Sequence, residues 1–529
     1  MRIIRSPYDD IEIPNTPLVP FVLQRLADSP DLVALVAADT GQSYTFAQLD
    51  LAIRQVACGL HARGIRKGDV VGIVSPNTPD FAVVFYAITT LGAICSTVNP
   101  IATAEEIGAQ FADSEAVMLF TVPALYEKCE AASRLASTVR EIAVFGTHDG
   151  AVPFAELFMH GDTPPHVEID PFNDVAVLPY SSGTSGVPKG VMLTHRNLVA
   201  NMLQCRYPEQ MLHHGDRVVG VLPFFHIYGM VVVMGYALIE GATVVTMPRF
   251  ELEAFLRVLQ DHRINYANIV PPILLALAKH PIVDNFDLSN LRYLFSGAAP
   301  LGADLVHAVE SRLAGVKVRQ GYGLTETSPV THTHPLRSER VSPDWVGPLR
   351  PNTAARLVDP VTEQDSAIGE RGELWLHGPQ VMKGYFNKPE ATASCLTPDG
   401  WFRTGDVAVV DADGWFQIVD RVKELIKYKG LQVAPAELEA LLLGHPSIAD
   451  AAVIPVPDDE AGEIPKAFIV PRSSISADEV MSYVAERVSP YKKIRVVEFI
   501  DAIPKSPSGK ILRRFLVDRE RARAAAGAS

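Results

Sequence analysis

The sequence predicts a chain of mixed α/β and α+β class, with a large N-terminal body of αβ subdomains, a β-rich subdomain and a small C-terminal domain. Its 529 residues exceed what one hydrophobic core usually holds. The first part alternates helical and buried-strand patterns, which is typical of a parallel sheet covered by helices. Beyond about Pro335, Gly, Pro and Asp separate short apolar runs, as in antiparallel strands.

The N-terminal body is predicted as alternating helices and strands. Apolar residues at helical spacing predict a helix over Phe46–Ile65, and a compact apolar run predicts a buried strand over Val70–Ser75. A second helix is expected over Pro79–Ile94, followed by an extended segment. Further strand-like runs of the same kind cover residues 115–122, 139–146, 174–182, 242–248 and 293–300.

One segment tests whether the chain crosses a membrane. Val218–Ile239 has no formally charged residue and is long enough to span a bilayer. Gly220, Pro223, Gly229 and Gly235 interrupt it. We therefore predict a buried strand, a turn and a buried helix here, and no integral membrane segment.

The C-terminal part is predicted as antiparallel strands followed by a small α+β unit. Residues 372–378 read GELWLHG and residues 414–421 read GWFQIVDR; both are strand-like. Pro435 stands at a plausible first helical position, and residues 476–489 form an amphipathic pattern. The sequence predicts one domain over residues 1–420 and a second over 421–529.

Composition limits the partners and the compartment. The formal net charge is −14, from 47 basic and 61 acidic residues, which argues against nucleic-acid binding through phosphate contacts. A small phosphate-bearing ligand stays compatible with a local basic pocket. The 5 cysteines are scattered, which indicates a reducing compartment. With no apolar leader pattern, a cytoplasmic location is expected, as a monomer or a homodimer.

A segment rich in glycine and hydroxyl groups follows one predicted strand. Residues 180–193 read YSSGTSGVPKGVML. Glycine lets backbone amides approach an anion, and hydroxyls and the Lys189 ammonium add donors. The pattern differs from a Walker loop, because Lys189 follows Val187-Pro188 instead of the second glycine. Short Ser/Gly/Pro clusters are usually surface turns, but this order with its lysine favours a phosphate cradle.

Five separated motifs together resemble the adenylate-forming superfamily, which comprises acyl-CoA synthetases, luciferases and peptide-synthetase adenylation domains. They stand in that family's order and cover nearly the whole chain. They are YSSGTSGVPKGVML at 180–193, QGYGLTE at 320–326, WFRTGD at 401–406, DRVKELIKYKG at 420–430 and PKSPSGKILR at 504–513. The set resembles 4-coumarate–CoA ligases and related acid–CoA ligases in particular.

The resemblance implies ATP, magnesium and CoA as cofactors, and a small-molecule carboxylic acid as substrate. It implies that residues 1–420 bind ATP and the acid, and that residues 421–529 form a mobile cap. Glu326 would ligate magnesium, a hard cation that suits a carboxylate oxygen. The nucleotide and CoA positions that the resemblance implies are Ser181, Ser182, Gly183, Thr184, Ser185, Gly186, Lys189, Gly297, Ala298, Ala299, Gln320, Gly321, Tyr322, Gly323, Thr325, Asp406, Arg421, Lys429 and Gly430.

The resemblance divides catalysis between two half-reactions. Lys510 would reach the acyl carboxylate and the α-phosphate during adenylation. The cap would then rotate about a hinge at Lys423, and Lys427 and Gln432 would serve thiol attack on the acyl-adenylate. Without the resemblance, Lys510 reads as a solvated lysine in a basic tail, and KELIKYKG at 423–430 reads as an exposed cationic strand.

The acyl pocket implied by the resemblance is mainly apolar. A histidine in apolar surroundings is more often a hydrogen-bonded core residue than a functional one, but the family places His226 at the pocket mouth, with a catalytic role. The implied pocket residues are His226, Tyr228, Val232, Gly321, Pro329 and Val330. They are expected to admit an aryl or alkyl acid. Plant-type coumarate ligases carry a cysteine-containing box where this chain has GELWLHG, so hydroxycinnamates, benzoates and fatty acids all stay open.

Other functions compete with the acid–CoA ligase interpretation. An adenylating enzyme that loads a carrier-protein phosphopantetheine, a luciferase-like oxygenase and a catalytically silent nucleotide-binding protein share these motifs in whole or in part. A serine hydrolase is disfavoured, because the chain lacks a G-x-S-x-G elbow. Two histidine pairs, His213-His214 and His332-His334, have no third metal ligand at recognisable spacing, so they are expected at the surface or in the core.

Overall fold

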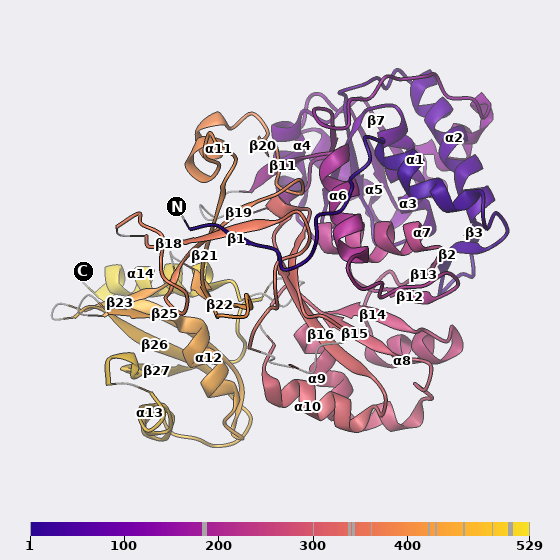
Figure 1. Ribbon diagram of the computed structural model, residues 1–529. Coiled ribbons are helices and arrows are strands. Elements are labelled where there is room, and N and C mark those ends of the chain that lie inside the picture. Colours follow the sequence, from indigo (N-terminus) through magenta and orange to yellow (C-terminus); the bar gives the residue numbers. More distant parts are fainter. Residues whose placement is uncertain are drawn as a thin grey trace.

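The computed structural model describes residues 2–181, 188–299, 301–336, 340, 344–360, 362–421, 424–428, 431–458, 461–488, 490–505 and 511–527. Within these residues the strands form four sheets, and Figure 1 shows how they are arranged. Helices cover the two sheets of the N-terminal body. A β-rich sheet lies between that body and the C-terminal sheet. The predicted mixed α/β and α+β architecture is confirmed.

The first sheet of the N-terminal body is mixed. Its central strands run parallel, as the alternating pattern predicts, while β11 joins β9 antiparallel. In spatial order its strands are β10 (Tyr180–Ser181), β11 (Lys189–Thr194), β9 (Val175–Val177), β5 (Ile94–Val98), β4 (Val70–Val74), β6 (Met118–Thr121), β7 (Glu141–Val144) and β8 (Val152–Pro153), and β20 (Gly384–Tyr385) pairs with β11.

The second sheet of the body is parallel from β16 through β2 and has antiparallel strands at its two edges. Its strands are, in order, β17 (Val330–Thr333), β16 (Lys317–Gly323), β15 (Tyr293–Ser296), β14 (Tyr266–Ile269), β12 (Arg217–Gly220), β13 (Thr243–Thr246), β2 (Val33–Ala37) and β3 (Ser43–Thr45). The main hydrophobic core contains residues from both sheets of the body.

The other two sheets belong to the β-rich part and the C-terminal part. The β-rich sheet is antiparallel in the order β1 (Ile4–Arg5), β18 (Ala354–Val358), β19 (Gly372–His377), β21 (Phe402–Val410) and β22 (Phe416–Arg421). The C-terminal sheet contains β24 (Leu431–Val433), β23 (Ile426–Tyr428), β26 (Gly462–Pro471) and β25 (Ile448–Asp458), and β27 (Val496–Phe499) pairs with β26.

The helices of the structure include those predicted over Phe46–Ile65 and residues 476–489, with shorter bounds. They are α1 (Leu18–Val22), α2 (Phe46–Ala62), α3 (Pro79–Thr90), α4 (Ala104–Ser114), α5 (Tyr126–Ser133), α6 (His195–Arg206), α7 (Tyr236–Glu240), α8 (Leu252–Asp261), α9 (Pro271–Lys279), α10 (Ala303–Arg312), α11 (Pro389–Cys395), α12 (Pro435–Leu443), α13 (Ala477–Ala485) and α14 (Arg513–Gly527). Short 3₁₀ segments cover Leu23–Leu26, Pro123–Leu125, Phe154–His160, Pro281–Asn285, Thr325–Thr327 and Pro490–Lys492.

The prediction of one helix over Pro79–Ile94 is wrong at its end. Helix α3 stops at Thr90, and Gly92 takes a φ of +65° that ends the helical path. Ile94 then enters β5 and pairs with Val70. Helix α3 is apolar on nearly every side because it packs against α2 and against strands of both sheets.

The uncharged segment Val218–Ile239 folds as a strand, a turn and helical structure, as predicted. Strand β12 ends at Gly220, a π-helical segment covers Tyr228–Gly235, and α7 follows directly. Gly229 lies against the backbone of Pro223, where an added Cβ would meet the Pro223 carbonyl oxygen at 2.1 Å. Among the described residues, no helix is long and apolar enough to cross a membrane.

Candidate active site

Glu326 lies at the meeting point of three chain segments. Its side chain is buried, in the 3₁₀ turn that follows β16. Ser181, the last residue of β10, donates its hydroxyl to Glu326 Oε1 at 2.6 Å. Tyr385, in β20, donates its hydroxyl to the same oxygen at 2.9 Å. Residues from two distant parts of the sequence therefore hold this carboxylate.

Lys189 lies on the other side of the same cluster. It is the first residue of β11, which pairs with β10 through Ser181. Its Nζ lies 5.2 Å from the centre of the Tyr385 ring, within the range of a cation–π contact. The cation of the glycine-rich motif and the carboxylate of the second motif thus share Tyr385 as a neighbour.

A second cluster joins Tyr322, Asp406 and Arg421. Tyr322 donates its hydroxyl to Asp406 Oδ2 at 2.5 Å, and Arg421 Nε lies 3.1 Å from Asp406 Oδ1. Strands β21 and β22 pair Asp406 directly with Arg421. Burial and the Asp406 carboxylate raise the pKa of Tyr322 well above its ordinary value, so its hydroxyl stays protonated and donates.

The backbone around the predicted adenine site is close-packed. A Cβ on Gly297 would meet the Tyr228 ring at 2.9 Å, and one on Gly323 would meet the Pro329 carbonyl oxygen at 1.9 Å. Ala298 has a φ of +69°, which is unusual for a residue with a Cβ. At Gly297 and Gly323, and at Gly321 in β16, the surrounding atoms therefore leave no room for a side chain.

Three other predicted nucleotide residues lie in the same region. The buried Gln320 donates its amide to the Trp345 carbonyl at 2.8 Å. Thr325 begins the 3₁₀ turn that carries Glu326. Ala299 follows β15 by three positions, and the roles predicted for all three stay predictions.

Three of the predicted acyl-pocket residues, His226, Tyr228 and Val232, lie close together in the sequence at the start of one π-helical segment. The Tyr228 hydroxyl lies 3.1 Å from the Phe295 carbonyl and 3.2 Å from Asn268 Oδ1, and the Tyr228 ring lies against Gly297. Val232 belongs to the same π-helical segment, and Val232, Pro329 and Val330 are buried. His226 is half-buried and accepts from the Tyr228 amide at 3.3 Å. The structure thus gives His226 a local backbone contact at the start of this wall.

Other predicted residues fall outside what the structure describes. Strands β23 and β24 form a hairpin in which Lys427 and Gln432 are paired; nothing is described of their side chains. The remaining predicted residues that lie outside the described part are Ser182, Gly183, Thr184, Ser185, Gly186, Lys423, Lys429, Gly430 and Lys510. Their roles stay predictions.

The two histidine pairs lie where the sequence analysis expects them. His332 and His334 lie in the core, and burial lowers their pKa values to about 3 and about 4. His213 and His214 are exposed.

Two site residues were not predicted from the sequence. Tyr385 contacts both Glu326 and Lys189, but a tyrosine between Gly384 and Phe386 carries no chemical signature of its own. Asn268 lies fully buried in β14, beside the Tyr228 hydroxyl. A polar side chain inside the strand-like run YANI at 266–269 was a usable signal, since an amide is buried only when it has a partner or a function.

Asp420 lies where the β-rich sheet passes into the C-terminal part. It is buried and accepts from the backbone amides of Arg421, at 2.7 Å, and Ala436, at 3.0 Å. Ala436 is in the first turn of α12, so Asp420 links β22 to that helix. Burial raises the pKa of Asp420 to about 6, although the nearby Arg513 acts to lower it.

We expect Asp420 to make stability pH-dependent in a direction opposite to that of most carboxylates. Its native pKa lies above its unfolded value, so its contribution is present at low pH and is lost as pH rises through about 6. The unfolding free energy of the wild type, minus that of Asp420→Asn, should fall by about 1–2 kcal/mol from pH 5 to pH 7.5. Urea unfolding at both pH values measures it, with exposed Asp261→Asn as the control. A difference that does not vary with pH would contradict it.

Comparisons with known proteins show the family to which the chain belongs. The profile of the AMP-binding enzyme family matches residues 22–386, and that of the AMP-binding enzyme C-terminal domain matches residues 437–510. The chain is 43% identical to 4-coumarate–CoA ligase 5 of Oryza sativa subsp. japonica over 99% of this chain and 98% of that protein. It is 42% identical to 4-coumarate–CoA ligase 2 of Nicotiana tabacum, with 99% and 98% covered.

Solved structures show the same fold. The crystal structure of the anthranilate CoA ligase AuaEII in complex with anthranoyl-AMP matches with a TM-score of 0.89 at 25% identity, over 97% of this chain and 99% of that one. ATP-bound MatB from Rhodopseudomonas palustris matches with a TM-score of 0.86 at 28% identity, over 96% and 99%. The chain therefore belongs to the AMP-binding enzyme family, and it is an AMP-forming acid–thiol ligase similar to 4-coumarate–CoA ligases.

Proposed function

We propose that the chain uses ATP to convert an aryl or fatty carboxylic acid, of 4-coumarate type or of medium to long chain, to acyl-AMP with release of pyrophosphate. It then transfers the acyl group to CoA, giving acyl-CoA and AMP. The observation that carries the proposal is that Ser181 and Tyr385 both donate to Glu326, while the Lys189 ammonium lies over the Tyr385 ring. A cation and a fixed carboxylate that share one aromatic neighbour support a site for the phosphates of ATP.

Glu326 fits a magnesium ion. Both described hydrogen bonds reach its Oε1, and within the described residues none reaches Oε2. A carboxylate oxygen is a hard ligand of the kind that Mg²⁺ prefers, and this ion usually completes its shell with waters and substrate phosphates. When bound, magnesium would neutralise charge on the phosphates of ATP.

The adenylation step joins two anions. A carboxylate oxygen of the acid attacks the α-phosphorus of ATP, and the bond to pyrophosphate breaks with its electron pair. We propose that Lys189, with Thr184 and Ser185, holds the β- and γ-phosphates, and that Lys510 stabilises charge between the acid and the α-phosphate. Positioned cations lower such a barrier because they stabilise charge in the transition state.

The second step needs a different set of groups. The CoA thiolate attacks the acyl carbonyl carbon, and the bond to the AMP phosphate breaks. We propose that the part beyond about residue 420 turns about Lys423 between the steps and brings the β23–β24 hairpin, with Lys427 and Gln432, to the acyl-adenylate. The pairing of these two residues across the hairpin supports their acting at one place.

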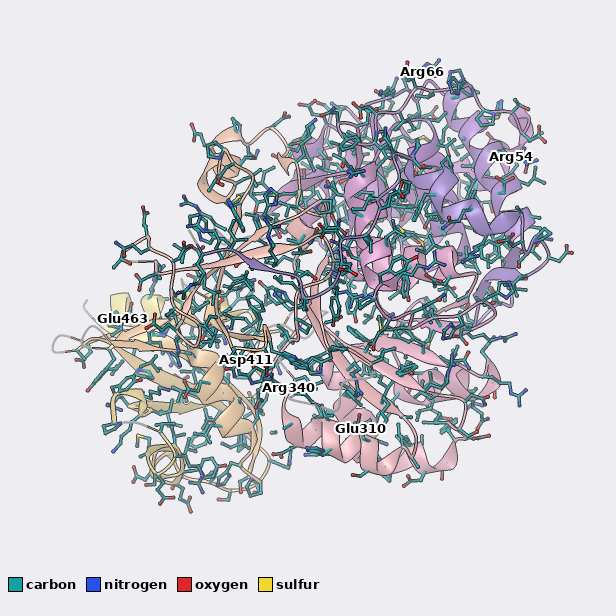
Figure 2. All side chains as sticks on the ribbon, in the orientation of Figure 1. Arg54, Arg66, Glu310, Arg340, Asp411 and Glu463 are labelled. Atoms are coloured by element: carbon teal, nitrogen blue, oxygen red, sulfur yellow. The ribbon has the colours of Figure 1, made fainter. Side chains whose placement is uncertain are left out.

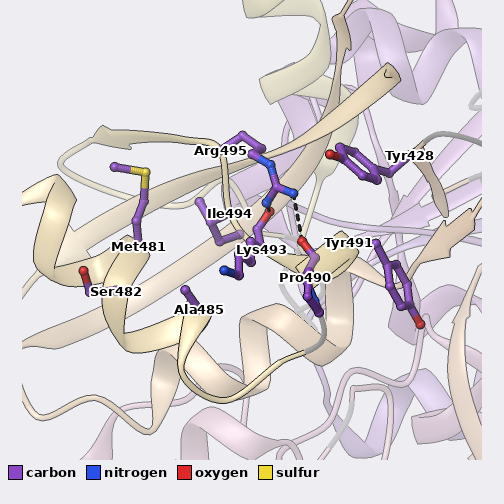
Figure 3. Close-up of a pocket in the computed structure, with 9 residues that line it drawn as sticks. All are labelled: Tyr428, Met481, Ser482, Ala485, Pro490, Tyr491, Lys493, Ile494 and Arg495. Carbon is purple, nitrogen blue, oxygen red and sulfur yellow. Dashed lines mark hydrogen bonds between the residues drawn. The ribbon is translucent and has the colours of Figure 1, made fainter. Parts of the chain in front are cut away.

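A cavity in the C-terminal part supports CoA as the acceptor. It has a volume of about 680 Å³, and Tyr428, Tyr491, Lys493 and Arg495 are among its lining residues (Figure 3). Arg495 lies over the Tyr428 ring at 4.8 Å and donates to the Pro490 carbonyl at 2.9 Å. Within the described residues the Lys493 ammonium has no ion-pair partner.

We propose that this cavity holds the phosphorylated adenosine end of CoA. Aromatic faces stack on a purine, and an ammonium attracts a phosphate. Tyr428 comes from the same strand as Lys427, so the cavity adjoins the hairpin that we assign to thiol attack. With its adenosine end held here, CoA would extend its thiol end toward that hairpin.

Lys493→Ala is expected to weaken CoA binding without affecting the adenylation step. Loss of one cation–phosphate contact should raise the KM for CoA about ten-fold, with acid-dependent pyrophosphate exchange unchanged. With dephospho-CoA as acceptor the wild type and the variant should become alike. Lys279→Ala, on α9 of the N-terminal body, is the control. Equal KM values for CoA in the variant and the wild type would contradict the site.

The Tyr228 region bears on the choice of acid. Asn268 Oδ1 lies 3.2 Å from the Tyr228 hydroxyl and 3.3 Å from the Tyr266 hydroxyl, while Asn268 Nδ2 has no partner among the described residues. With either assignment of the amide atoms, one polar atom of Asn268 is left over. A ring hydroxyl both donates and accepts, so it matches either assignment. The 4-coumarate–CoA ligase relatives favour such an acid.

A screen of acids tests the proposed function. Pyrophosphate release is measured over hydroxycinnamates, benzoates and fatty acids of graded length, with and without CoA. We expect activity with at least one of these classes and acyl-CoA formation with free CoA. Acceptance of only a carrier-protein phosphopantetheine, or light emission with luciferin, would favour the alternative adenylating enzymes. Absence of acid-dependent release across the panel would contradict the proposal.

A further inference from the structure

Tyr385 belongs to a short segment that joins the two halves of the nucleotide site. Strand β20 pairs antiparallel with β11, so that Tyr385 lies opposite Val191, and the Phe386 amide donates to the Gly190 carbonyl at 2.8 Å. At the other end of the segment, the Met382 amide donates to the Glu326 carbonyl at 2.9 Å. The segment is therefore bonded to the strand that begins with Lys189 and to the backbone of Glu326.

The Tyr385 side chain also connects these two parts of the chain, because it contacts the side chains of both Glu326 and Lys189. Only 7% of the residue is exposed. Its hydroxyl donates to Glu326 Oε1, and its ring lies beneath the Lys189 ammonium. One rigid side chain with two rotatable bonds thus contacts both the carboxylate and the cation of the site.

These contacts restrict groups that otherwise have many conformations. Lysine and glutamate side chains have many rotamers, and each loses conformational freedom when it is held in place. Ser181 and Tyr385 both donate to Oε1 of Glu326, and among the described residues none donates to Oε2, the oxygen that we assign to a ligand. The ring of Tyr385 offers Lys189 an aromatic face within the range of a cation–π contact.

We propose that Tyr385 is a positioning residue that sets the Glu326 carboxylate through its hydroxyl and the Lys189 ammonium through its ring. The proposal rests on the proposed function, in which Glu326 meets magnesium and Lys189 meets the terminal phosphates of ATP. The hydroxyl and the ring of Tyr385 have different roles in this proposal, and two variants test the two roles one at a time.

Tyr385→Phe removes the hydroxyl and keeps the ring. We expect Mn²⁺ to bind the protein–ATP complex about ten-fold more weakly, as measured from the electron paramagnetic resonance signal of free Mn²⁺. ATP binding without metal, measured by calorimetry, should stay within about two-fold, because Lys189 keeps its aromatic neighbour. Conversion of supplied acyl-adenylate to thioester should also be unchanged.

Tyr385→Leu removes both contacts and is expected to weaken Mn²⁺ binding and metal-free ATP binding together. The matched control is Tyr44→Phe, which removes another hydroxyl that donates to a carboxylate, that of Asp80 at 2.7 Å. In that control variant, the affinity for Mn²⁺ and the affinity for ATP should both equal those of the wild type.

The outcomes separate positioning from a structural role. If Tyr385→Phe bound Mn²⁺ within two-fold of the wild type, or lost metal-free ATP binding as much as Mn²⁺ binding, the proposal would be wrong. Failure of the proposed function looks different. The wild type would then bind ATP and Mn²⁺ but show no acid-dependent pyrophosphate exchange, whatever the result for Tyr385.

Discussion

Asp406→Asn is expected to lower kcat/KM for ATP by at least about 100-fold. The reason lies in the charge and the lone pairs of this carboxylate. Tyr322 and Arg421 occupy one position on each oxygen, and an ionised carboxylate has about four such positions. A carboxylate in this position can accept from both vicinal hydroxyls of a ribose. Two hydrogen bonds to a charged group are each worth about 1.5–3 kcal/mol, which accounts for an effect of this size.

The structure offers a matched control for Asp406. Asp411 lies in the turn that follows β21 and pairs with Arg340 at 2.6 Å (Figure 2). Asp411→Asn removes a paired carboxylate from the same hairpin and should leave the kinetics for ATP unchanged. Steady-state kinetics with ATP varied at saturating acid and CoA measure both variants. A kcat/KM for ATP within three-fold of the wild type in Asp406→Asn would remove the ribose assignment.

Lys510→Ala is expected to abolish adenylation while sparing thioester formation. Adenylation loses the cation between the acid and the α-phosphate, and loss of such a group commonly costs about 10²–10³ in rate. The variant should still convert supplied acyl-adenylate and CoA to acyl-CoA. Acid-dependent pyrophosphate exchange measures the first step, and thioester formation from synthetic acyl-adenylate measures the second.

Lys427→Ala provides the reciprocal test. It should spare pyrophosphate exchange and slow thioester formation, because the β23–β24 hairpin is assigned to the second step. Opposite defects in the two variants are expected only if different parts of the C-terminal domain serve the two steps. Equal loss of both half-reactions in both variants would rule out the division of labour between Lys510 and the hairpin.

Much of the fold could be predicted because local patterns encode it. The capping box of Thr45 and Gln48 begins α2 where the helical pattern begins, and Pro435 starts α12 as its position indicates. The end of α3 was mispredicted, because an apolar run passes without a break from a buried helix into a buried strand. Periodicity does not separate the two in such a run.

Long-range strand pairing could not be predicted from the sequence. Strand β1 pairs with β18 near the other end of the chain, and β2 completes the sheet formed by β12 to β16. No local signal specifies such partners, since pairing depends on which edge the rest of the fold leaves open.

The residues of the candidate site also divide into those that the sequence could predict and those that it could not. Lys189, Glu326, Asp406 and Arg421 were predicted because each lies in a motif, and the structure brings them into two clusters. Tyr385 was not, because its role arises only from the pairing of β20 with β11. The resemblance implied an acyl pocket whose side chains are mainly apolar and include the Tyr228 hydroxyl. The buried Asn268 adds a polar group beside that hydroxyl, which sharpens the expected choice of acid.

We propose that the chain forms an acyl-adenylate and then passes the acyl group to a thiol. The most direct test is ATP–pyrophosphate exchange without CoA, followed by product analysis with CoA present. We predict exchange that requires the acid but not CoA, and one AMP and one acyl-CoA for each ATP consumed. Formation of ADP and phosphate, or exchange that appears only when CoA is added, would contradict the account.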